Sequence, residues 1–261
     1  MASIDLTPSR DLGTIAINVT TDGLTLTGLY RQDATSWVPS RPVRVDEGTF
    51  PTTNPPIIVD YEPALTGLIR YTATFADGPN LTYTLGDGWA APDLTWLSVP
   101  LWPGQSVAVE MVTTYDSGRA SGNVFHEIID RVDPAVTLAP LRTRRGQLEI
   151  WCADYPATLT VTAVLDLSQV LQLRQTTHPG MDMYFTAAGD VATSHYPIER
   201  GMPTRWAVRV PFREVARPVG DLIENLGWSF DDVAAEFATF DQLPSVFATF
   251  DDLATNTRIT P

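Results

Sequence analysis

The chain has 261 residues, which is enough for one large domain or for two to three small ones. It carries 31 acidic and 17 basic residues, so its formal net charge is −14 at pH 7, and every basic residue is an arginine. Duplex DNA and anionic membrane surfaces attract proteins with a surplus of Lys and Arg. We therefore expect neither as a partner. A hydrophobic fraction of 44% and a charged fraction of 18% are typical of a globular chain.

Cysteine content and hydropathy bear on the compartment. Cys152 is the only cysteine, which excludes an intramolecular disulfide. The first residues show no basic stretch followed by an apolar one, and no run of about 18 apolar residues occurs. The sequence thus predicts no signal peptide and no membrane span. We expect synthesis in a cytoplasm.

Residues 14–90 have the pattern of a β-sandwich, preceded by an N-terminal arm over residues 1–13. Ile15, Ile17 and Val19 alternate with smaller or polar residues, which is typical of a strand with one buried face. Leucines at 24–29 follow a Thr-Asp-Gly turn signal, which favours a hairpin with the preceding strand. Further strands are expected over residues 57–61, 68–75 and 81–85, separated by Gly, Pro, Asp and Asn clusters.

Residues 91–218 form a second β-rich module with one helix. Strands are expected over residues 105–115, 147–152, 183–186 and 206–210. Residues 156–174 are ambiguous, because their beginning, TLTVT, is rich in β-branched residues and strand-like. Their second half carries an apolar stripe with helical spacing, so we place the helix there.

The last segment, residues 219–261, contains three decamer repeats, over residues 227–236, 237–246 and 247–256. Phe230, Phe240 and Phe250 align in them. Each repeat has Ser or Thr before its Phe and an acid or amide three positions after that hydroxyl residue, the pattern that begins a helix. The repeats therefore predict short helical turns that restart every ten residues, and Pro244 is incompatible with one continuous helix.

These repeats are too short to bury their own apolar side chains. They either pack on the second module or dock on another protein. Between Arg217 and Arg258 the chain has eight acidic residues and no basic one, which favours docking on a basic groove. The candidate docking residues are Trp228, Phe230, Val233, Phe237, Phe240, Leu243, Phe247, Phe250 and Leu253.

Few residues suggest catalysis. The three histidines lack the spaced partners of a zinc site, and no nucleotide-binding or hydrolase motif occurs, so we expect no metal, no cofactor and no enzymatic activity. Asp60 and Glu62 share one face of an expected strand, as a glycosidase dyad or calcium site would require. A solvated strand face is the favoured interpretation.

Tryptophans raise a second possibility. Trp37, Trp89, Trp96 and Trp102 could form a sugar-stacking platform, although such residues more often lie in cores or interfaces.

Several stretches, taken in their order along the chain, carry a family resemblance. They are IIVDYEPALTGLIRY at residues 57–71, RTRRGQLEI at 142–150, DMYF at 182–185 with GDV at 189–191, and the FATFDQL and FATFDDL repeats. Together they resemble minor tail proteins of long-tailed bacteriophages of actinobacteria, and the likeness covers most of the chain.

The resemblance implies a structural protein of the virion, in the tail tip or baseplate. It implies a fibronectin type III-like sandwich followed by a β-barrel or sandwich with an associated helix, and no catalytic residues. Expected partners are other tail proteins. Because tail assemblies are built on rotational axes, we expect a homo-oligomer, a trimer or a multiple of three.

Two rival functions stay open. A receptor-binding module would contact a host cell-wall glycan through exposed tryptophans. A wall-degrading hydrolase at the tail tip would need Asp60 and Glu62, or another acid pair, in a deep cleft.

Overall fold

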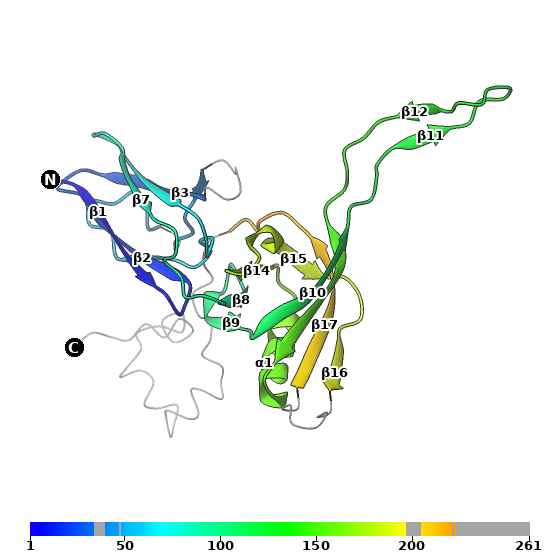
Figure 1. Ribbon diagram of the computed structural model, residues 1–261. Helices are drawn as coiled ribbons and strands as arrows, with labels where there is room; N and C mark the ends of the chain where they lie inside the picture. Colours follow the sequence, from blue (N-terminus) through cyan, green and yellow to red (C-terminus); the bar gives the residue numbers. More distant parts are fainter. Residues whose placement is uncertain (34–39, 47, 197–204, 221, 223–261) are drawn as a thin grey trace, which may run out of the picture.

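The computed structural model of the chain describes residues 1–33, 40–46, 48–196, 205–220 and 222. The described residues are mainly β, as the sequence indicates, and form two modules joined near residue 90. A long β-hairpin projects from the second module (Figure 1). The expected docking residues of the C-terminal repeats all lie outside the described residues, as does Trp37.

The first module is a sandwich of two antiparallel sheets. One sheet has the strand order β1-β2-β5 and the other β4-β3-β6-β7, and the residues between them form the core of a β-sandwich. The strands are β1 (Ser3–Ser9), β2 (Thr14–Thr20), β3 (Leu26–Asp33), β4 (Arg41–Pro42), β5 (Ile58–Asp60), β6 (Ile69–Phe75) and β7 (Leu81–Leu85). The strands expected over 57–61, 68–75 and 81–85 are therefore present.

Two expectations for this module are corrected. Residues 3–9 are not a separate arm, because β1 pairs with β2 along its whole length, from Ser3 opposite Thr20 to Ser9 opposite Thr14. The expected hairpin of β2 with β3 is also wrong. The turn after Thr21 carries the chain from one sheet to the other, so that β2 pairs with β5 and β3 with β6. The alternating isoleucines of β2 face the core between the sheets, as predicted.

The second module is built on an open eight-stranded sheet. Its order is β10-β13-β17-β15-β14-β8-β9, and β16 also pairs with β17. The strands are β8 (Thr95–Ser98), β9 (Val107–Ala108), β10 (Met111–Gly118), β13 (Arg145–Cys152), β14 (Leu171–Gln175), β15 (Met183–Ala187), β16 (Ala192–Tyr196) and β17 (Arg205–Glu214). Two short 3₁₀ turns, η1 (Pro103–Gln105) and η2 (Pro179–Met181), complete it.

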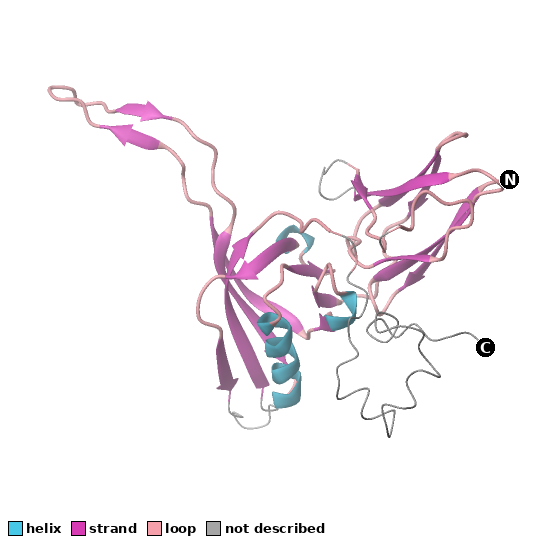
Figure 2. Ribbon diagram, turned by 180° about the vertical axis from the view of Figure 1, so that it is seen from behind, coloured by secondary structure: helices cyan, strands magenta, loops and turns pink. Residues whose placement is uncertain are grey.

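One α-helix occurs among the described residues, α1 (Tyr155–Asp166), which packs on β13 and β17 (Figure 2). The sequence places the helix too late: TLTVT is helical, and Leu171–Gln175 is strand β14. The Asp154 side chain accepts a hydrogen bond from the Ala157 amide and so begins the helix. The β-branched threonines are tolerated because Thr158 and Thr162 donate their hydroxyls to carbonyls four residues earlier.

Between β10 and β13 the chain leaves the sheet as a hairpin. Strands β11 (Val124–His126) and β12 (Ala135–Thr137) pair with each other and with no other described strand. Residues 119–144 are named the hairpin arm here. In both views the arm stands away from the two modules (Figures 1 and 2). Among the described residues, no helix is both long and apolar enough to cross a membrane.

Gly146 should be irreplaceable where β13 enters the sheet. A Cβ at this position would lie 1.7 Å from the backbone oxygen of Asp116 on β10, so Gly146→Ala should force the two strands apart and destabilise the fold by at least about 2 kcal/mol. Gly118→Ala on β10 is the matched control, because nothing lies within 4 Å of its Cβ. Urea unfolding of both variants measures the difference, and equal stabilities would contradict the close approach of β10 and β13.

Candidate functional site

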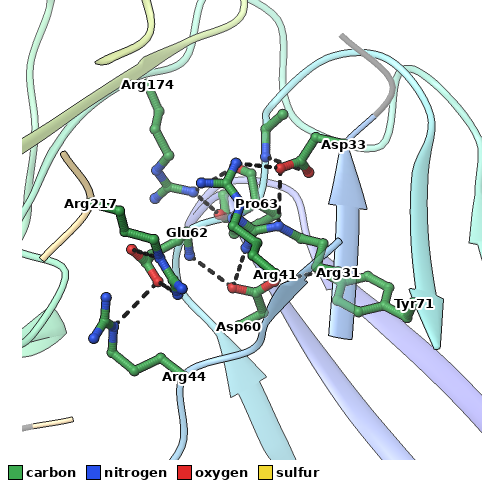
Figure 3. A network of polar contacts seen from close by, with 12 residues as sticks. Arg31, Asp33, Arg41, Arg44, Asp60, Glu62, Pro63, Tyr71, Arg174 and Arg217 are labelled. Atoms are coloured by element: carbon green, nitrogen blue, oxygen red, sulfur yellow. Dashed lines mark hydrogen bonds and ion pairs between the residues drawn. The ribbon is translucent and has the colours of Figure 1, made fainter. Parts of the chain in front are cut away.

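Two features stand out from the fold. One is a cluster of charged side chains buried where the modules meet, named the junction here. The other is the hairpin arm. The junction comprises Arg31, Asp33, Arg41, Arg44, Asp60 and Glu62 of the first module and Arg174, Tyr184 and Arg217 of the second (Figure 3 draws most of them).

Arg31 is the centre of the first half of the junction. Its side chain is only 1% exposed, and its Nη1 contacts both carboxylate oxygens of Asp60, at 2.7 and 2.6 Å. Its Nε donates to Asp33 at 3.1 Å. Asp60 accepts a further hydrogen bond from the Tyr71 hydroxyl at 2.9 Å. Because Arg31 belongs to β3 and Asp60 to β5, this ion pair joins the two sheets of the sandwich.

Glu62 connects the first module to the second. It is 2% exposed and pairs with Arg217, which follows β17, and with Arg44 of its own module. The Tyr184 hydroxyl on β15 donates to Glu62 Oε1 at 3.0 Å. Arg41 links Tyr184 to Asp33, with contacts of 3.2 and 2.8 Å. Every contact of this half of the junction therefore involves a charged group.

Arg174 on β14 supplies a second link between the modules. It is 2% exposed, and its Nη1 donates to the backbone oxygens of Gly13 and Pro63, at 2.8 and 3.1 Å. Its Nε and Nη2 point to the Ser98 hydroxyl on β8. A guanidinium has five N–H donors. Arg174 uses Nη1 to hold two loops of the first module against the sheet of the second, while Nε and Nη2 bind Ser98 of its own sheet.

The electrostatics of the junction follow from burial and pairing. Burial alone raises the pKa of Glu62, but the hydrogen bond and charge of Arg217, together with Arg31 and Arg44, hold that pKa at about 2. Burial and the charge of Glu62 raise the pKa of Tyr184 to about 12. Burial likewise raises the pKa of Asp182, a neighbour of Arg174, to about 8. Glu62 is thus ionised and Tyr184 protonated at neutral pH.

The structure places Asp60 and Glu62 side by side in the junction (Figure 3). They are not a solvated strand face, since both are 2% exposed. A cavity of about 220 Å³ beside Glu62 has Asp33, Arg41, Asp182 and Tyr184 among its other lining residues, and Asp60 does not line it. A general acid needs a pKa near the working pH, whereas ion pairing holds the pKa of Glu62 at about 2. The arrangement suits a structural tie better than an acid–base pair.

The three described tryptophans of the expected sugar platform, Trp89, Trp96 and Trp102, do not gather on one face. Trp89 is buried in the first core, and Trp96 packs against the same core. Trp102 packs against the core of the second module. These three residues therefore supply packing in two different cores and not a common platform. The three histidines also lie apart, and among the described residues no group of three His, Cys, Asp or Glu could hold a metal ion.

The hairpin arm is the part of the described chain with the most exposed apolar side chains. Ile129 and Val132 at its tip are 91% and 98% exposed, and Phe125, Leu138 and Leu141 are also exposed. The arm is held by its own bonds, such as Ala139 N to Asn123 Oδ1 at 2.9 Å and Arg142 N to Ala120 O at 2.9 Å. An isolated two-stranded ribbon is marginally stable in water, and exposed apolar clusters mark interaction sites.

The hairpin arm is not predicted by the sequence pattern. Its apolar residues show no regular alternation, because neither face lies on a core, and periodicity detects only one-sided burial. A usable signal was present in the composition: the arm together with Arg145, the first residue of β13, holds five arginines and three acids in a chain that is otherwise strongly acidic.

Glu62→Gln tests the junction. The variant leaves the buried Arg44 and the partly buried Arg217 without a countercharge, so it should lower the free energy of unfolding by about 3–5 kcal/mol at pH 7. Glu110→Gln is the control, because its ion pair with Arg205 is accessible to solvent and is worth about 1 kcal/mol or less. Equal losses for the two variants, measured by urea unfolding, would contradict the assigned role.

The stability lost in Glu62→Gln should also depend on pH. Because folding lowers the pKa of Glu62 from 4.5 to about 2, ionised Glu62 stabilises the fold above pH 4.5, and this stabilisation is lost as the pH falls towards 2. The stability difference between wild type and Glu62→Gln should therefore shrink across that window. A difference that stays constant from pH 5 to pH 2 would show that the Glu62 pKa is not lowered.

Comparisons with known proteins add no family to this picture. No model of a known protein family matches the sequence, and no curated protein matches it.

Proposed function

We propose that this chain is a structural, non-enzymatic protein of a phage tail tip or baseplate. It acts by assembly: its hairpin arm and its acidic C-terminal repeats bind neighbouring subunits. The observation that carries the proposal is the exposed hairpin arm, whose apolar tip contacts neither module. Burial of such side chains on a neighbour stabilises association by about 1.5–3 kcal/mol for each large aliphatic residue.

The junction supports an assembly role because it fixes the direction of the arm. Strands β10 and β13 lead directly into the arm, and β13 pairs with β17, which ends just before Arg217. Paired strands and the ion pairs of the junction thus connect the arm to the first module. A rigid two-module body that presents one apolar arm is suited to joining subunits at a set angle.

The tail-tip assignment comes from the resemblance to minor tail proteins. Stretches that carry it supply the residues described above: residues 57–71 contain Asp60, Glu62 and Tyr71, residues 142–150 form the return from the arm into β13, and residues 182–185 contain Tyr184. A homo-oligomer with closed rotational symmetry, a trimer or a multiple of three, fits this role. Its place is the virion tail, after synthesis in the host cytoplasm.

Ile129→Gln/Val132→Gln tests the arm. The double variant should fold normally but enter purified phage particles at least tenfold less than wild type, because two aliphatic side chains lose their buried contacts. Ile57→Gln/Leu159→Gln is the matched control, since both residues are exposed on the two modules. Immunoblots of particles made by complementation measure incorporation. Normal incorporation of the arm variant would overturn the proposed role of the arm.

A second test removes the repeats. A chain truncated after residue 221 should remain folded by circular dichroism and no longer join particles, because the candidate docking residues Trp228 to Leu253 are gone. If the truncated chain is folded and incorporated at the wild-type level, the repeats are not a docking segment.

A further inference from the structure

The root of the hairpin arm forms a groove of about 640 Å³. Its charged lining residues are Arg142, Arg145 and Arg213, and no acidic residue lines it. Ala120, Ala188 and Pro211 supply an apolar floor. We name it the arginine groove. Its volume lies in the range of pockets that hold a peptide segment or a small ligand.

The three arginines lack countercharges. All three are exposed, and none has an ion-pair partner among the residues that the structure describes. The nearest carboxylate along the chain, Glu214, already pairs with Arg144 at 2.8 Å. Arg145 and Arg213 are moreover directly opposite each other in the β13–β17 ladder. Like charges in that position repel each other, and a bound carboxylate would relieve the repulsion.

This concentration of positive charge is unusual for the chain. Residues 119–145 hold five of its 17 arginines but only three of its 31 acids. The complementary segment is in the same sequence: from residue 218 to residue 257 there are eight acids and no basic residue. In each repeat an aspartate directly follows Phe230, Phe240 or Phe250, so one repeat offers a carboxylate and an aromatic ring together.

We propose that the acidic repeats of this chain, residues 227–256, bind the arginine groove, with aspartates on its arginines and phenylalanines on its apolar floor. The inference deepens the proposed function, and rests on it for the docking role of the repeats. The chain described by the structure ends at residue 222, and the 34 residues from there to residue 256 span up to roughly 110 Å when extended. Reach therefore does not limit the contact.

Photocrosslinking on the full-length chain tests the proposal. A benzophenone amino acid replaces Phe240, and mass spectrometry locates the residues to which it crosslinks. Crosslinks should fall on peptides containing Ala120, Arg142, Arg145 or Ala188, and 1 M NaCl should lower their yield severalfold by screening. Crosslinks confined to other surfaces would overturn the proposal.

Charge variants make the test specific. Arg145→Glu/Arg213→Glu should lower the groove crosslink at least tenfold, whereas Arg10→Glu/Arg70→Glu, two exposed arginines of the first module with the same change in net charge, should leave it unaltered. Circular dichroism monitors folding. If charge reversal unfolds the sheet, Arg145→Gln/Arg213→Gln removes the two charges without reversing them and replaces the first variant in the test. An undiminished crosslink in a folded groove variant contradicts the assignment.

Mixing isotopically light and heavy copies distinguishes this inference from the proposed function. Groove crosslinks between light and heavy copies support both. Groove crosslinks only within one copy support occupancy of the groove by the repeats but contradict docking of the repeats on a neighbour. Absence of groove crosslinks overturns this inference, while the incorporation tests on the hairpin arm still decide the proposed function by themselves.

Discussion

Burial of charge at the junction is the constraint on which the arrangement of the two modules depends. Asp60 and Glu62 of the first module, like Arg31, are almost completely removed from solvent, and so is Arg174 of the second. A buried charge is tolerated only when it is paired and hydrogen-bonded. Arg217 and Tyr184 reach Glu62 from the second module, and Arg174 reaches backbone oxygens of the first. Separation or rotation of the modules would break these contacts, so the junction defines one relative orientation.

The hairpin arm and its root show the opposite condition, because their requirements are not met within the described chain. Ile129 and Val132 are exposed at the tip, and Arg145 and Arg213 face each other at the root without a countercharge. Apolar surface drives association without direction, whereas complementary charge selects the partner and the register. A tip that needs an apolar contact and a root that needs carboxylates are consistent with a subunit whose contacts are completed only in an assembly.

Most strands could be predicted from the sequence, because burial of one face of a strand makes apolar residues such as Ile15, Ile17 and Val19 alternate with smaller or polar ones. The partners of these strands could not be predicted: alternation is local, and the pairing of β2 with β1 and β5 in place of β3 depends on contacts distant along the chain. The helix was misplaced because β-branched TLTVT looks strand-like until the cap at Asp154 and the threonine hydrogen bonds are known. Asp60 and Glu62 were recognised as a pair, but their arginine partners lie 29 and 155 residues away and no spacing rule predicts them.

The most direct test of the assembly role is a cryo-electron microscopy map of the tail tip of phage particles purified from cells that express this chain. In the proposed assembly, the map should contain several symmetry-related copies, each with its junction intact and with Ile129 and Val132 of the hairpin arm buried against a neighbouring subunit. Particles that lack the chain, or copies whose hairpin arms project into solvent without contacting any subunit, would contradict it.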